Sequence, residues 1–220
     1  MPQAAVVNRT AQQANVVGAY RPQSGYSQQQ NMIMEAFRAE EYIKDQMDVQ
    51  AEPIYDTNTQ VTADIIQQGQ PSGVFFTNIS GKALNLTNMK QPNQLMNPEA
   101  LAIFCYRYYL DPRNSILDSE NVMADFALRF VMGQKPYQTV PLWMIPQGGG
   151  LNVGGCCDGS CVITNGWPTK EAIRPIAVTL VLEQGVWFEG ELFGGPYTIA
   201  ATQGFIHSLN LDGLHARGIQ

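Results

Sequence analysis

The chain has 220 residues and a formal net charge of −6, from 13 Lys and Arg against 19 Asp and Glu. Charged residues make up only 15%, which indicates that much of the surface is buried against partners, because interface cores are depleted of charge. The acidic balance disfavours a general nucleic-acid binder, which needs clustered Lys and Arg, and no apolar run approaches the ~18 residues of a membrane-spanning helix.

Residues 1–30 are rich in Gln and contain no acidic residue. A segment of this composition cannot bury enough apolar surface to offset its ordering entropy. Val and Tyr side chains recur through it as candidate anchors. The sequence therefore predicts an extended N-terminal arm that orders on a neighbouring copy of the chain. For the low charge content of the whole chain, a general compositional bias toward Gln is the alternative explanation to burial against partners.

One helical pattern follows, over residues 27–48. Ser27 and Gln30 are spaced as a capping box, and the apolar positions that fall near one face are Ile33, Phe37, Ile43 and Met47. This helix packs either on its own domain or on another subunit. We expect residues 1–50 to form the arm and helix and residues 51–220 to form one β-domain.

From Glu52 onward the pattern changes to short runs of β-type alternation separated by turn residues. Predicted strands cover residues 61–65, 74–76, 104–110, 124–130, 140–146, 176–182, 187–193, 197–201 and 205–211. A helical turn is expected at 97–99, a hairpin is expected to join 176–182 to 187–193, and Asp212 and Gly213 are expected to end the last strand. The fold class predicted is all-β, a jelly-roll-type β-sandwich with an N-terminal arm and one N-terminal helix.

Aromatic side chains occupy both faces of the strand predicted around residue 106. Tyr106, Tyr108 and Tyr109 surround Arg107. Such a strand is buried on both sides or lies at an interface, where Tyr and Arg are enriched.

Four cysteines are the first candidates for chemistry. Cys156, Cys157 and Cys161 share a Gly-rich loop, and Cys105 lies about fifty residues earlier on a predicted strand. Structural zinc sites present paired cysteines from two knuckles, and this loop offers one. We expect packing thiols rather than a metal or cofactor site. A disulfide within the loop is an alternative, although synthesis in a cytosol disfavours it.

Acid-base candidates are few. His207 and His215 are the two histidines, and a dyad of Cys157 with His207, oriented by Asp212, is the one nucleophilic arrangement available. Glu189 and Glu191 share a strand face with Trp187 at a predicted separation of ~7 Å, close to that of inverting glycosidases. A solvated strand face is the simpler explanation, and no enzyme activity is predicted. The run GGGLNVGG lacks the Lys and Ser or Thr of a phosphate-binding loop.

The second half of the chain, from about residue 124 to 220, resembles single jelly-roll structural proteins of bacterial viruses. The resemblance lies in the strand–turn–strand of residues 126–142, in Ile145-Pro146 with the glycines that follow, and in the ending at residues 209–214. It implies a virion shell or vertex subunit that is synthesised in the host cytoplasm, self-assembles with other virion proteins, and ties subunits together through terminal arms. Contact with an internal membrane stays open.

Two other functions fit the sequence. A virion spike or a carbohydrate- or receptor-binding β-sandwich would use the loop from Gly148 to Trp167. A small enzyme would use the acidic pair or the cysteine loop.

Overall fold

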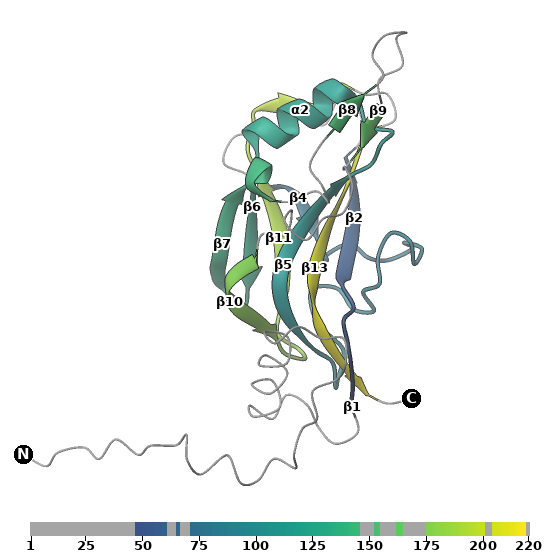
Figure 1. The fold of residues 1–220 in the computed structure, drawn as a ribbon, viewed down its shortest axis with the longest axis vertical. Coiled ribbons are helices and arrows are strands. Elements are labelled where there is room, and N and C mark those ends of the chain that lie inside the picture. The colour runs from purple at the N-terminus through teal and green to yellow at the C-terminus, as the bar shows by residue number, and fades with distance from the viewer. Residues whose placement is uncertain are drawn as a thin grey trace, which may run out of the picture.

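The computed structural model describes residues 47–60, 65–66, 71–145, 152–154, 162–164, 175–200 and 204–218. Within these residues the chain is mostly β and forms two large antiparallel sheets with one α-helix, α2 (Ile116–Asp125). Figure 1 shows the two sheets side by side, with α2 across one end. The prediction of a β-rich chain is confirmed.

Sheet I contains β1 (Met47–Gln50), β2 (Ile54–Gln60), β5 (Ala100–Leu110), β10 (Pro175–Leu182) and β13 (Phe205–Gly218). The strand order is β1-β13-β5-β10, and β2 also pairs with β13. β2 pairs with residues 205–211 of β13 and β1 pairs with residues 215–218, so the two short strands share one edge of the long strand.

Sheet II contains β4 (Pro71–Phe75), β6 (Ala127–Met132), β7 (Lys135–Pro141) and β11 (Phe188–Phe193), in the order β4-β11-β6-β7. A 3-10 turn, η3 (Leu142–Met144), follows β7. Two small two-stranded sheets pair β3 (Ile65–Ile66) with β12 (Tyr197–Thr198) and β8 (Asn152–Gly154) with β9 (Val162–Thr164).

The main core lies between the two sheets. Large side chains with no exposed surface come from both of them, including Phe75, Tyr108, Phe130, Phe188 and Phe205. Such inward-facing rows from two sheets are compatible with a β-sandwich.

A second, smaller apolar cluster lies on the opposite face of sheet I. Its buried members are Val49, Ala100, Ala102, Leu214 and Ala216. Ala100 and Ala102 alternate along β5 with Leu101 and Ile103 of the main core, so near β1 both faces of sheet I are buried.

Several sequence predictions are wrong in detail. β10 and β11 are not hairpin partners, because β10 pairs with β5 in sheet I whereas β11 pairs with β4 and β6 in sheet II. Alternation identifies the buried face of a strand and carries no information about its partner. The last strand continues through Asp212 and Gly213 to Gly218.

Helix predictions also fail within the described residues. Residues 97–98 form a turn before β5 rather than a helical turn, while α2 was not predicted. Ser115 stands at its N-cap position, and Ala124 belongs to it rather than to a strand. Of the predicted helix 27–48, residues 47 and 48 lie in β1; its other residues, the arm and the strand positions 61–64 lie outside the described residues.

Close backbone contact requires glycine at position 213. Asp212 pairs with Cys105 and Gly213 pairs with Ile103, so Phe104 is an extra residue in β5 and forms a bulge. A Cβ on Gly213 would lie 2.1 Å from the carbonyl oxygen of Ala102.

We expect Gly213→Ala to lower the free energy of unfolding by about 2–3 kcal/mol, because backbone atoms must move to admit the methyl group. Gly218→Ala is the matched control on the same strand, since its Cβ would come no closer than 3.3 Å, to the flexible ring of Pro98. Urea unfolding of both variants measures the difference. Equal stability of the two variants would contradict the assigned contact.

Candidate functional site

The predicted acidic pair lies on the outer face of sheet II. Glu189 and Glu191 occupy alternate positions of β11, opposite Val131 and Arg129 of β6. Arg129 Nε donates to Glu191 Oε2 at 2.6 Å, and its guanidinium carbon lies 3.9 Å from the centroid of the Phe193 ring. Trp187 precedes β11 and is 41% exposed.

The surroundings of Glu189 disfavour its ionised form. Burial, the charge of Glu191 and a hydrogen bond between the two groups raise the pKa of Glu189, while Thr77 and Arg129 lower it less. Because Arg129 pairs with Glu191, the two acidic side chains lie on a strand face that also carries their basic partner.

Cys105 is a buried free thiol. Its Sγ donates to Asp212 Oδ2 at 3.3 Å, and Arg107 binds both oxygens of the same carboxylate. Burial, followed by the charge of Asp212, raises the pKa of Cys105 to about 12. A thiol of this kind is neither a nucleophile nor a ready metal ligand. Cys156, Cys157 and Cys161 lie outside the described residues.

His207 lies in the main core and not beside Asp212. Its Nδ1 is 2.7 Å from the hydroxyl of Tyr108, and Phe75 and Phe205 contact the ring. Burial and, to a smaller extent, the charge of Lys82 lower the pKa of His207 to about 3. The carboxylate of Asp212 is held by Arg107, on the other face of β13, so it cannot orient His207 as a catalytic base.

His215 lies among charged side chains at the end of sheet I. Its ring nitrogens lie 3.8 Å from Glu52 Oε2 and 3.7 Å from Glu99 Oε2. Arg217 binds Glu52 at 2.8 Å and Lys90 binds Glu99 at 2.6 Å. Burial alone would raise the pKa of Glu99, but His215 and Lys90 lower it to about 2. These contacts tie the β1–β2 connection and the start of β5 to the end of β13.

The rings predicted to flank Arg107 divide between the two faces of β5. Tyr106 and Tyr108 lie in the main core, and burial raises the pKa of both. Tyr109 is 41% exposed on the opposite face. The strand is therefore apolar mainly on its inner face at this end.

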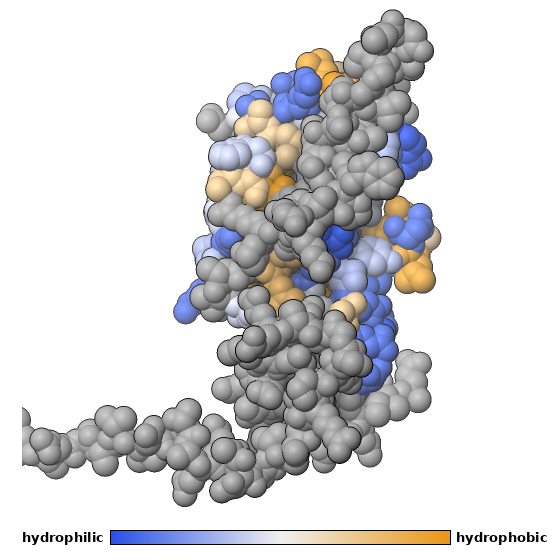
Figure 2. Space-filling model, in the orientation of Figure 1, coloured by the Kyte–Doolittle hydropathy of each residue, from blue (hydrophilic) through white to orange (hydrophobic). Residues whose placement is uncertain are grey.

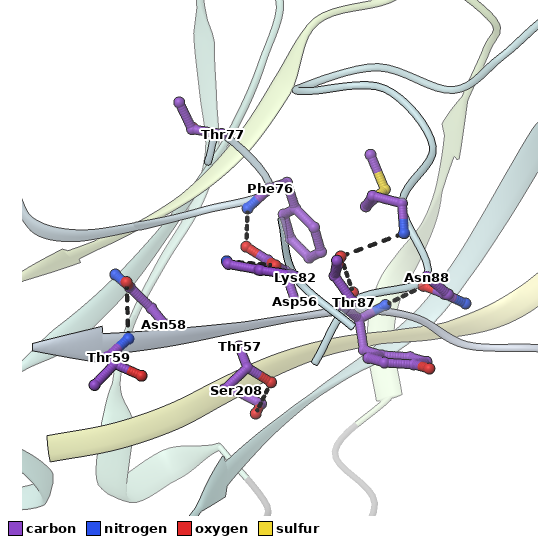
Figure 3. A network of polar contacts seen from close by, with 12 residues as sticks. Asp56, Thr57, Asn58, Thr59, Phe76, Thr77, Lys82, Thr87, Asn88 and Ser208 are labelled. Carbon is purple, nitrogen blue, oxygen red and sulfur yellow. Dashed lines mark hydrogen bonds and ion pairs between the residues drawn. The ribbon is translucent and has the colours of Figure 1, made fainter. Parts of the chain in front are cut away.

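The sequence analysis did not predict one polar network of the structure. This network holds the long loop between β4 and β5, residues 76–99, which is called the β4–β5 loop. Figure 3 shows its centre, Asp56 on β2. Asp56 is fully buried; it accepts from Phe76 N at 2.7 Å and from Lys82 Nζ at 2.8 Å. The bond from Phe76 stabilises a left-handed backbone at that residue, with φ of 71°.

The same loop runs along the outer edge of β2. Thr57 N donates to Leu86 O at 2.8 Å, and Asn88 N donates to Tyr55 O at 3.4 Å. Asn88 returns a bond from its side chain to Pro53 O at 2.8 Å, and Thr57 Oγ1 lies 2.7 Å from Ser208 Oγ on the neighbouring strand (Figure 3). The loop therefore covers a strand edge that would otherwise offer unpaired backbone groups. A lone Asp in an otherwise uncharged strand was the signal available in the sequence.

A metal site has no support in the described ranges. No group of three or more His, Cys, Asp or Glu side chains there is arranged to hold a metal ion. Of the loop from Gly148 to Trp167, only the strand residues 152–154 and 162–164 are described.

No helix among the described residues is both long and apolar enough to span a membrane. No family model, curated protein or solved structure matches this chain.

Proposed function

We propose that this chain is a jelly-roll structural subunit of a viral shell, which assembles with copies of itself and with other virion proteins. The observation that carries the proposal is the nested pairing of the eight long strands. Taken in chain order, the first pairs with the last (β2 with β13), the second with the seventh (β4 with β11), the third with the sixth (β5 with β10) and the fourth with the fifth (β6 with β7).

Nested pairing of this kind is what an eight-stranded jelly roll requires. The remaining contacts, β13 with β5 and β11 with β6, join the four pairs into two sheets with four long strands each, and the short β1 is a fifth strand of sheet I. Viral capsid domains are among the principal users of this architecture, although lectins and cupins share it. Because a fold alone does not define a function, the assembly role rests on two further features.

The first feature is the low charge content of the chain, 15%, which favours a surface largely buried in contacts. The second is the N-terminal segment and the way it joins the domain. β1, which follows residues 1–46 in the chain, pairs with the end of β13, so the part of the chain that contains the predicted arm leads into sheet I.

We expect deletion of residues 1–26 to leave the β-domain folded and to impair assembly, because the deletion ends well before β1. Light scattering and electron microscopy of the full-length and shortened chains measure particle size, and circular dichroism checks the fold. A full-length chain that stays monomeric would contradict the proposed function. Equal assembly by both chains would contradict only the role of the arm.

A further inference from the structure

The outer edge of sheet I carries almost no charge. This edge surface comprises β2 (54–60) and residues 77–86 of the β4–β5 loop, all of them described. Its only charged side chains are Asp56 and Lys82, which pair with each other and are 0% and 19% exposed. The rest are apolar residues or uncharged Tyr, Thr, Asn, Gln, Ser and Gly.

One large apolar side chain of this surface is exposed. Leu84 is 75% exposed, the highest value among the large hydrophobic residues that the structure describes. Figure 1 shows the β4–β5 loop protruding beyond β2, and Figure 2 shows hydrophobic residues together with hydrophilic ones at the same protrusion. Protein–protein interfaces have an apolar centre that is depleted of charged residues and a polar rim. An exposed leucine surrounded by uncharged polar residues has this composition.

The protrusion is held rigidly. The hydroxyl of Tyr55 donates to the carbonyl of Leu84, and Leu86 N donates to Ala83 O at 2.8 Å. Lys82, two residues before Leu84, is fixed by the buried Asp56. A surface ordered before binding loses little entropy on association, which distinguishes it from a loop that is only solvated.

We propose that this edge surface, anchored by Leu84, is where one copy of the chain contacts a second copy. The inference rests on the proposed self-assembly. Copies of a chain with net charge −6 repel one another, so they approach most favourably where exposed charge is lacking. A basic partner would instead select acidic surface, and an anionic membrane or nucleic acid would select basic surface.

The test compares full-length variants by sedimentation and light scattering over a concentration series. We expect Leu84→Asp to raise the concentration needed for association at least tenfold, with an unchanged thermal unfolding midpoint because Leu84 is exposed. Leu84→Lys should weaken association as well, since it removes the apolar anchor while reducing the net negative charge. Leu117→Asp on α2 is the matched control, because Leu117 is 57% exposed and lies outside the edge surface.

Association of Leu84→Asp equal to that of the unaltered chain would overturn the proposed surface and leave self-assembly standing. If Leu84→Asp weakens association and Leu84→Lys does not, the anchoring role of the leucine is overturned. The same follows if Leu117→Asp weakens association as much as Leu84→Asp does. If the unaltered chain is monomeric at every concentration, self-assembly fails and the proposed surface fails with it.

Discussion

Replacing Asp56 with Ala is expected to lower the free energy of unfolding by about 3–5 kcal/mol, the usual cost of removing one partner of a buried ion pair. The carboxylate of Asp56 has no exposed surface and binds both the ammonium of Lys82 and the backbone N–H of Phe76. Alanine leaves a largely buried cation and a buried N–H without their acceptor. It also removes the contact that stabilises the left-handed backbone of Phe76.

Thermal unfolding should report this loss as a midpoint lower by roughly 10 °C, from about 2–4 °C per kcal/mol in a chain of this size. Asp56→Asn is the graded control, because it keeps an acceptor for Phe76 N and removes the charge. The double variant Asp56→Leu with Lys82→Met should recover much of the stability, since it leaves no unpaired ion. A loss below about 1 kcal/mol in Asp56→Ala would show that the network contributes no more than an exposed pair.

Acidification is expected to destabilise the protein through His207. The pKa of His207 is about 3 in the folded chain, against 6.5 for an ordinary histidine. Between pH 6.5 and 3 the unfolded state therefore binds a proton that the folded state excludes, and stability falls as the pH falls. Each pH unit in this window costs up to about 1.4 kcal/mol. The main cause of the lowered pKa is burial of His207 among the rings of Phe75, Tyr108 and Phe205, which cannot replace the water around an imidazolium.

His207→Asn isolates this effect, because the amide can still bond to Tyr108 and does not titrate. Urea unfolding of both proteins at pH 7.5, 6, 5 and 4 gives the difference in stability. We expect the original chain to lose about 2–3 kcal/mol relative to the variant between pH 6 and 4. A difference that does not change with pH would mean that His207 is protonated without cost.

Sequence patterns alone predict the β-rich class and the positions of several strands, although they do not predict β2. Alternation of apolar and polar residues is a local property, so it located β10, β11 and much of β5 and β13 correctly. It also identified Glu189 and Glu191 as neighbours on one strand face, because a period of two residues follows directly from the backbone geometry.

The pairing of the strands, in contrast, depends on the fold of the whole domain. β10 and β11 are adjacent in sequence, yet they enter different sheets. The alternation pattern of a strand does not identify which other strand it pairs with. The same holds for the polar sites. Asp56 meets Lys82 and Phe76, and His207 meets Tyr108, through contacts between segments that the alternation pattern does not relate. A local pattern specifies the face a residue occupies, while its burial, partners and protonation depend on what the folded chain brings against that face.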